Sequence, residues 1–174
     1  MDYAVPNPMQ GLTRILVVDD DAPTLRMIEF ILQSEGYEVV GAANGMAATS
    51  QCIDEQPDLL LLNVQLPDSN GFDVYAHLQE LGYSGPVVFV TARPDIAEVL
   101  TERRLNVAGY LVKPLYPDEV VVLVRRVLQT RREMAVRTAR AQPIWDSVKP
   151  ATTAQTPIAA TYHPDMRSHP DMVP

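Results

Sequence analysis

The chain contains a single cysteine, Cys52, and so lacks the cysteine pairs of a disulfide framework or of a cysteine-based metal cluster. We predict that Cys52 is a small core residue. The N-terminus lacks the basic start and apolar run of a secretory leader, and no segment approaches the about 18 apolar residues of a membrane-spanning helix. These absences predict a cytoplasmic protein that neither crosses a membrane nor is exported through a cleaved leader.

Charge is distributed unevenly along the 174 residues, which carry a net charge of -8. Up to residue 124 the net charge is -12, from Arg125 to Arg140 it is +5, and from Ala141 onward it is -1. An acidic body argues against nucleic acid as its partner. The basic stretch has three interpretations: a solvated helix extension, which is the default, a seam that forms a homodimer, or a surface that contacts anions.

Short apolar runs alternate with helical patterns five times, which is typical of a parallel sheet covered by helices on both faces. The runs are Arg14 to Val18, Tyr37 to Ala42, Leu59 to Leu62, Pro86 to Val90 and Gly109 to Val112. Because Leu59 to Leu62 does not alternate with polar residues, we predict a central strand buried on both sides.

The helix between the first two runs has clear boundary signals: Asp21 can cap it, Pro23 lies in its first turn, and Gly36 ends it. We predict the other helices at about 45–56, 71–81, 94–106 and 117–140. The last is long, and its polar part from Gln129 onward should project beyond the body.

The residues outside these patterns predict flexible ends. We divide the chain into a flexible N-terminus over 1–12, a domain over 13–130, a helical extension over 131–141 and a disordered tail over 142–174. Six of the last 34 residues are proline, and the tetrapeptide His-Pro-Asp-Met occurs at His163 and again at His169. Such a segment cannot bury enough apolar surface to offset its ordering entropy. Within it, Trp145 is a candidate docking anchor.

Polar residues stand where the predicted strands end, and in an open parallel sheet ligands bind at this edge. The first run ends in Asp19-Asp20-Asp21, the third in Asn63, the fourth in Thr91 and the fifth in Lys113-Pro114. Carboxylates bind hard cations such as Mg²⁺, and an ammonium group meets phosphate oxygens. The pattern therefore predicts a site for a cation and a phosphoryl group.

Four segments in this order and spacing carry a family resemblance: Ile15 to Asp21, Leu66 to Gly71, Val87 to Ala92 and Gly109 to Pro114. Together they resemble the response-regulator receiver domain of two-component signalling, over about residues 13 to 130. The resemblance implies an α/β fold of the flavodoxin-like kind, with a doubly wound five-stranded parallel sheet in the order 2-1-3-4-5.

The same resemblance implies a role for each site residue. Asp19 and Asp20 match the pair that binds Mg²⁺, and Gln65 would add its backbone carbonyl. Thr91, Ala92 and Lys113 match the phosphate site, Thr91 and Tyr110 match the switch pair, and the bond before Pro114 matches one that is cis in the family.

The sequence departs from the family at Asn63, which stands where the family has the phosphate-accepting aspartate. A neutral amide is a poor nucleophile, so we expect no phosphotransfer at this residue and no enzymatic activity, and we expect weak or absent Mg²⁺ binding. Asn63 also removes a third carboxylate from beside Asp19 and Asp20. This relieves repulsion, since two like charges about 4 Å apart repel each other by about 4 kcal/mol at an effective dielectric near 20. The amide also loses the ion pair that a carboxylate at this position would form with Lys113.

Asn63 has two explanations, a natural pseudo-receiver or an engineered replacement of aspartate, and we favour the natural one. We therefore predict a stand-alone signalling module that works through protein contacts without phosphorylation. Its alternatives are a phospho-accepting receiver, if residue 63 is natively Asp, and a regulator that contacts nucleic acid through the basic last helix. In the family the output face corresponds to residues 94–128 here, and a histidine kinase or phosphotransfer protein is the expected upstream partner.

Overall fold

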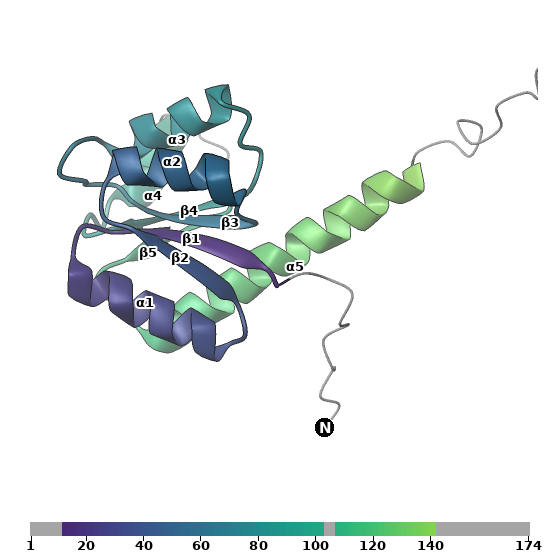
Figure 1. Ribbon diagram of the computed structural model, residues 1–174, viewed down its shortest axis with the longest axis horizontal. Helices are drawn as coiled ribbons and strands as arrows, with labels where there is room; N and C mark the ends of the chain where they lie inside the picture. Colours follow the sequence, from purple (N-terminus) through teal and green to yellow (C-terminus); the bar gives the residue numbers. More distant parts are fainter. Residues whose placement is uncertain (1–11, 103–106, 142–174) are drawn as a thin grey trace, which may run out of the picture. The chain divides into compact units, whose positions relative to one another are not determined.

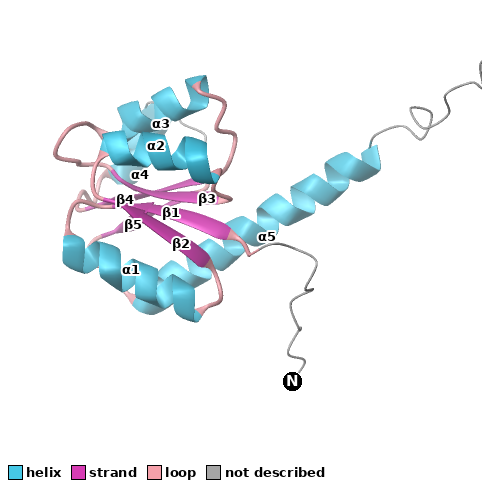
Figure 2. Ribbon diagram, viewed as in Figure 1, coloured by secondary structure: helices cyan, strands magenta, loops and turns pink. Residues whose placement is uncertain are grey.

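The computed structural model describes residues 12–102 and 107–141 (Figure 1). Strands and helices alternate along these residues, as Figure 2 shows. In chain order they are β1 (Arg14–Val18), α1 (Ala22–Ser34), β2 (Glu38–Ala42), α2 (Gly45–Glu55), β3 (Leu59–Asn63), α3 (Gly71–Glu80), β4 (Val87–Thr91), α4 (Ile96–Glu102), β5 (Gly109–Val112) and α5 (Pro117–Ala141). The tail with Trp145 and its tetrapeptide repeat, and the first eleven residues, lie outside the described part.

All five strands form one parallel sheet in the order β2-β1-β3-β4-β5, which confirms the predicted fold class. Two strands extend one residue further than the apolar runs suggested. Asn63 pairs in register with Val90, and Thr91 with Val112. Backbone pairing does not require an apolar side chain, so a polar residue can end a strand while still belonging to its ladder.

The sheet separates two apolar layers. Helices α2, α3 and α4 pack on one face through residues such as Cys52, Phe72 and Ile96. Helices α1 and α5 pack on the other, for example through Ile28 and Val124. Strand β3 is buried on both faces, as its uninterrupted leucines predicted, because its alternate side chains enter the two opposite layers. Cys52 is a buried core residue, as predicted.

Helix α1 has the predicted boundaries. The Asp21 carboxylate accepts hydrogen bonds from the Thr24 backbone, at 3.0 Å, and from the Thr24 hydroxyl, at 2.6 Å. The bond from the hydroxyl has the larger effect and the backbone bond adds to it, so together they hold the pKa of Asp21 below its ordinary value. At the other end, Gly36 adopts a φ of 86° and reverses the chain into β2.

Helix α4 begins two residues later than the predicted start at residue 94. It begins at Ile96 because the backbone oxygen of Asp95 already accepts from the N–H groups of Glu98 and Val99, which makes Asp95 the residue that precedes the helix. The Arg93 guanidinium, paired with the Asp95 carboxylate, holds this turn. The predicted end of the helix falls on residues 103–106, which are outside the described part.

Helix α5 runs unbroken from Pro117 to Ala141. Its first half is anchored in the core, and the side chains of residues 129–138 are exposed, as their polarity predicted. The exposed part still contacts the body at two points that the sequence did not reveal. Arg131 Nη1 lies 3.0 Å from Asp58 Oδ1, and Arg132 Nη2 donates to the Thr13 hydroxyl at 3.0 Å. None of the described helices combines the length and apolarity needed to cross a membrane.

Candidate functional site

The candidate site lies at the carboxyl edge of the sheet, where the ends of four neighbouring strands bring together residues far apart in sequence. Asp19 follows β1, Asn63 ends β3, Thr91 ends β4 and Lys113 follows β5. Asp19, Asn63 and Thr91 are the buried polar side chains among the described residues. Burial of polar groups is costly unless they are paired, so the partners of these three decide what the site can do.

The side chain of Asn63 is held by hydrogen bonds at both ends of its amide. The Nδ2 group donates to Asp20 Oδ1 at 2.9 Å and, more weakly, to Asp19 Oδ1 at 3.5 Å. The Oδ1 atom accepts from the backbone N–H of Gln65 at 3.3 Å, which fixes the orientation of the amide. An amide in this orientation turns its donors, and not a nucleophilic oxygen, toward the acidic pair.

Lys113 forms its ion pair with Asp19, a partner that the sequence did not indicate. Lys113 Nζ lies 2.7 Å from Asp19 Oδ2, without the alignment of a hydrogen bond, so the attraction is one of charge. Asp19 Oδ1 also accepts from the Asp21 backbone at 2.9 Å. Asp19 is 1% exposed, so this lysine neutralises a carboxylate that is shielded from water.

The two proposed switch residues differ in burial. Thr91 is buried, and its Oγ1 accepts from the backbone N–H of Arg93 at 3.1 Å. Tyr110 lies on β5 with 43% of its surface exposed, so its ring is at the surface of the molecule. Ala92, the remaining residue assigned to the phosphate site, is exposed beside Thr91.

The start of the β5–α5 connection is also held at this edge. The backbone N–H of Lys113 donates to the backbone oxygen of Thr91 at 2.8 Å, which keeps the end of β5 beside the end of β4. The peptide bond between Lys113 and Pro114 is cis.

The loop after β3 is fastened by residues to which sequence reasoning gave no role. The two oxygens of Asp68 accept from the backbone N–H groups of Gly45, at 2.9 Å, and Met46, at 3.0 Å, and so join this loop to the N-terminus of α2. Asn70 caps α3 by accepting from Phe72 N at 2.9 Å. Both residues belong to the motif Leu66 to Gly71, which could have indicated that they matter. The motif does not indicate that Asp68 binds the N-terminus of α2.

The receiver resemblance implies a Mg²⁺ ion at this acidic pocket, and these residues, as arranged, do not fit one. The site offers only the carboxylates of Asp19 and Asp20, and the described residues contain no group of three or more His, Cys, Asp or Glu suited to a metal. The amide N–H groups of Asn63 and the ammonium of Lys113 already meet the oxygens that an ion would need.

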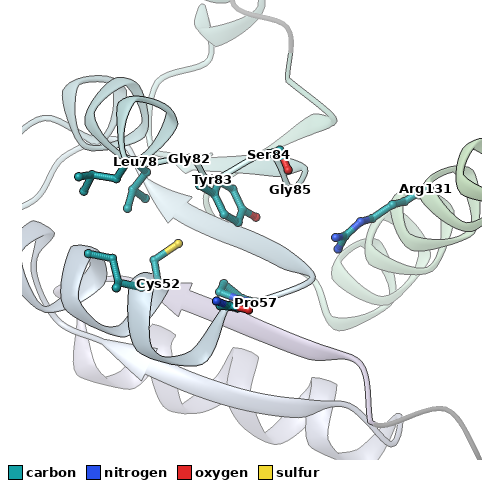
Figure 3. Close-up of a pocket in the computed structure, with 11 residues that line it drawn as sticks. Cys52, Pro57, Leu78, Gly82, Tyr83, Ser84, Gly85 and Arg131 are labelled. Carbon is teal, nitrogen blue, oxygen red and sulfur yellow. The ribbon is translucent and has the colours of Figure 1, made fainter. Parts of the chain in front are cut away.

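A separate cavity of about 430 Å³ lies between the end of α2, the turn after α3 and Arg131 of α5 (Figure 3). Burial raises the pKa of the Cys52 thiol that lines it, which disfavours the reactive thiolate. The Tyr83 hydroxyl donates to the Pro86 oxygen at 2.9 Å, and Arg131 is engaged with Asp58. The polar groups of Tyr83 and Arg131 already have partners outside the cavity lining, and we assign the cavity no function.

Comparison with known proteins agrees with this geometry. The sequence model of the family described as the response regulator receiver domain matches residues 15–125. The DNA-binding response regulator MtrA of Mycobacterium tuberculosis is 38% identical over 117 residues, which cover 67% of this chain and 50% of that protein. The alkaline phosphatase synthesis transcriptional regulatory protein PhoP of Bacillus subtilis is 32% identical over 122 residues, which cover 70% and 50%.

Solved structures give the same result. A CheY-like response regulator receiver domain protein from Methanospirillum hungatei superposes with a TM-score of 0.66 and 27% identity, over 71% of this chain and 99% of that one. This chain spans about half the length of the curated relatives that it matches.

Proposed function

Because the chain belongs to the response regulator receiver family of two-component signalling, we propose that it is a receiver that signals through protein contacts without accepting phosphate at residue 63. The single observation that carries the proposal is the amide of Asn63, which donates to Asp20 Oδ1 at 2.9 Å. An acceptor must offer an anionic oxygen to phosphorus, and an amide whose N–H groups face the acidic pair offers none.

The ion pairs and hydrogen bonds of the site support a resting state that needs no added ion. Asn63 supplies the acidic pair with N–H donors, and Lys113 supplies it with a positive charge. The amide and the ammonium group thereby offset the negative charge of the acidic pair, as a metal ion would. We propose that Asp19, Asp20 and the Gln65 carbonyl bind Mg²⁺ weakly or not at all for this reason.

The proposed output is contact with protein partners through residues 94–128, of which 103–106 are outside the described part. The described part of this face exposes Tyr110, Tyr116 and Val122, which are apolar surfaces suited to a partner. In this proposal Thr91 and Tyr110 set the shape of the face. A histidine kinase or a phosphotransfer protein is the proposed upstream partner.

Nucleic-acid binding by the basic end of α5 has less support than protein contact. Arg125 pairs with Glu35, Arg131 with Asp58, and Arg132 donates to Thr13. A basic side chain committed to its own body contributes less to a phosphate-binding surface.

The test is the substitution Asn63→Asp, which restores an anionic nucleophile beside Asp19, Asp20, Thr91 and Lys113. Both proteins are incubated with acetyl phosphate and Mg²⁺, and covalent labelling is followed by intact mass. We expect a phosphoryl mass gain only in the Asn63→Asp variant, located at residue 63 by peptide mapping.

Labelling of the parent at residue 63 would contradict the proposal, provided that the unlabelled mass shows no prior deamidation. An Asn63→Ala variant serves as a matched control, since it also lacks a nucleophile and must stay unlabelled there. A folded Asn63→Asp variant that stays unlabelled would show that the pocket no longer supports the chemistry of its family.

A further inference from the structure

Helices α2 and α3, which pack on one face of the sheet, contain acidic residues and no lysine or arginine. No lysine or arginine occurs from Met27 to Ala92, whereas this stretch contains nine acidic residues. It includes α2 and α3, each with two acidic residues, which lie side by side on the face opposite α1 and α5 (Figure 1). The surface of α2 and α3 is therefore negative, while the far end of α5 is positive.

An apolar groove runs between these two helices, and we call it the α2–α3 groove. It is an open depression of about 550 Å³, lined from α2 by Met46 and Ile53 and from α3 by Val74 and His77. Met46 and Ile53 are 79% and 53% exposed. An exposed apolar surface rimmed by polar residues is typical of a site where a protein partner binds.

The dimensions of the groove suit a helix. Met46 and Ile53 are seven residues apart on α2, so they share one face of it and stand about 10 Å from each other along its axis. The small side chains of Thr49 and Ser50 line the groove between them. Two large apolar side chains that flank a low floor can receive a side chain of a second helix, as in ridges-into-grooves packing.

The rim of the groove is acidic at defined points. Asp68 and Asp73 both line it. The backbone N–H groups of Gly45 and Met46 hold the Asp68 carboxylate in place, and they hold its pKa below the ordinary range. This carboxylate is thus fixed and remains ionised at neutral pH.

We propose that the α2–α3 groove binds a basic amphipathic helix of a partner protein. The apolar stripe of that helix contacts Met46, Ile53 and Val74, and its lysine or arginine side chains face Asp68 and Asp73. Charge complementarity identifies the class of partner, since an acidic helix would be repelled from this rim. Asn63 and the other residues assigned to the phosphate site do not line the groove, so this proposal does not depend on the state of that site.

A partner protein is favoured over a second copy of this chain. The basic helix that a second copy could offer is the end of α5, and three of its arginines are already engaged with residues of their own body. Their release would oppose docking, whereas a separate helix carries no such cost.

The probe is an amidated peptide of about 18 residues, long enough to be helical when bound, with leucines at three-four spacing and lysines elsewhere. The control peptide has the same composition, rearranged so that its leucines share no face. Affinity is measured by fluorescence anisotropy on the full chain, and the contact surface is mapped by ¹⁵N chemical shifts. We expect the amphipathic peptide to bind, with shifts on α2 and α3, and the rearranged peptide to bind at least about tenfold more weakly.

Two matched variants locate the contact. Ile53→Gln removes an apolar contact without changing charge, and we expect about a fivefold loss of affinity, since the exposed half of the side chain is no longer buried. Val136→Gln makes a comparable change at a 51% exposed position of α5 and should bind like the parent. Asp73→Asn should make binding less sensitive to salt. If Ile53→Gln does not fold, Met46→Gln takes its place.

Equal binding of the two peptides, or unchanged affinity in Ile53→Gln, would overturn the proposal and leave only non-specific charge attraction. Self-association of the parent in sedimentation, abolished by Ile53→Gln, would assign the groove to a second copy and would also overturn it.

Discussion

At the position of Asn63, one atom changes the character of the pocket. A carboxylate there would add a third negative charge beside Asp19 and Asp20, whereas the amide brings N–H donors to within 2.9 Å of Asp20. Repulsion is thereby exchanged for a hydrogen bond to a charged group, which contributes about 1.5–3 kcal/mol. The pocket gains order and loses its nucleophile through the same substitution.

The backbone behind Asn63 leaves no room at Gly71. A Cβ atom at Gly71 would stand 2.3 Å from the Asn63 backbone oxygen and 3.0 Å from Val64 Cα. We predict that Gly71→Ala lowers the free energy of unfolding by about 1–3 kcal/mol, because backbone must shift to admit the methyl group. Urea unfolding followed by circular dichroism measures the loss.

Gly36→Asn provides the comparison, since Gly36 has a φ of 86° but a Cβ atom there would meet nothing within 4 Å. Asparagine tolerates this conformation, so the cost should stay below about 1 kcal/mol. If the two variants lose the same stability, close packing behind Asn63 is not what requires glycine at residue 71.

At the scale of elements, α5 combines two environments in one helix. Its first turns enter the apolar layer that α1 shares, and its later turns are exposed but contact the starts of β1 and β3 through arginines. A helical segment shorter than about 12–15 residues is marginal in water by itself, so these contacts help to keep the exposed turns helical.

We predict that Arg131→Gln increases amide hydrogen exchange over residues 129–138, because the ion pair with Asp58 is lost. The free energy of unfolding of the whole domain should change by less than about 1 kcal/mol, as is usual for exposed ion pairs. Hydrogen–deuterium exchange with mass spectrometry separates the two effects.

Arg137→Gln is the matched control, since it removes an arginine of the same helix that has no ion pair or hydrogen bond with the described body. Its exchange should match that of the parent. Equal exchange in Arg131→Gln and the parent would show that helix propensity alone maintains these turns.

For the whole molecule, the two faces of the sheet differ in charge as well as in packing. Helices α2 and α3 contain acidic residues and no lysine or arginine, while α5 carries a surplus of arginine. The two faces of the sheet can therefore attract partners of opposite charge.

We predict that millimolar Mg²⁺ leaves the melting temperature of the parent nearly unchanged. In Asn63→Asp the restored carboxylate should allow the ion to bind, and a ligand at about 100 times its Kd stabilises by about 2.7 kcal/mol, which corresponds to several degrees. Differential scanning calorimetry with Mg²⁺ and with matched ionic strength from NaCl makes the comparison. A rise of several degrees in the parent would show that Asn63 leaves the metal site intact.

The sequence alone determined the layout of the domain. Apolar runs and helix signals are local, so the five strands, the α1 boundaries and the buried β3 could be predicted from neighbouring residues. The order of the sheet came from the receiver resemblance, whereas the polar residues at its edge followed from the ends of the apolar runs. Strand ends were less certain because Asn63 and Thr91 are polar, yet still pair in the ladder.

Only the tertiary structure decided which groups pair with which. Several acidic residues compete for Lys113, and burial beside the ends of β1 and β5 assigns it to Asp19. Three contacts join residues between 23 and 73 positions apart. They are the bond that orients the Asn63 amide, the attachment of Asp68 to α2 and the contact of Arg131 with Asp58. Such choices depend on distances and rotamers set by packing, and no local pattern in the sequence encodes them.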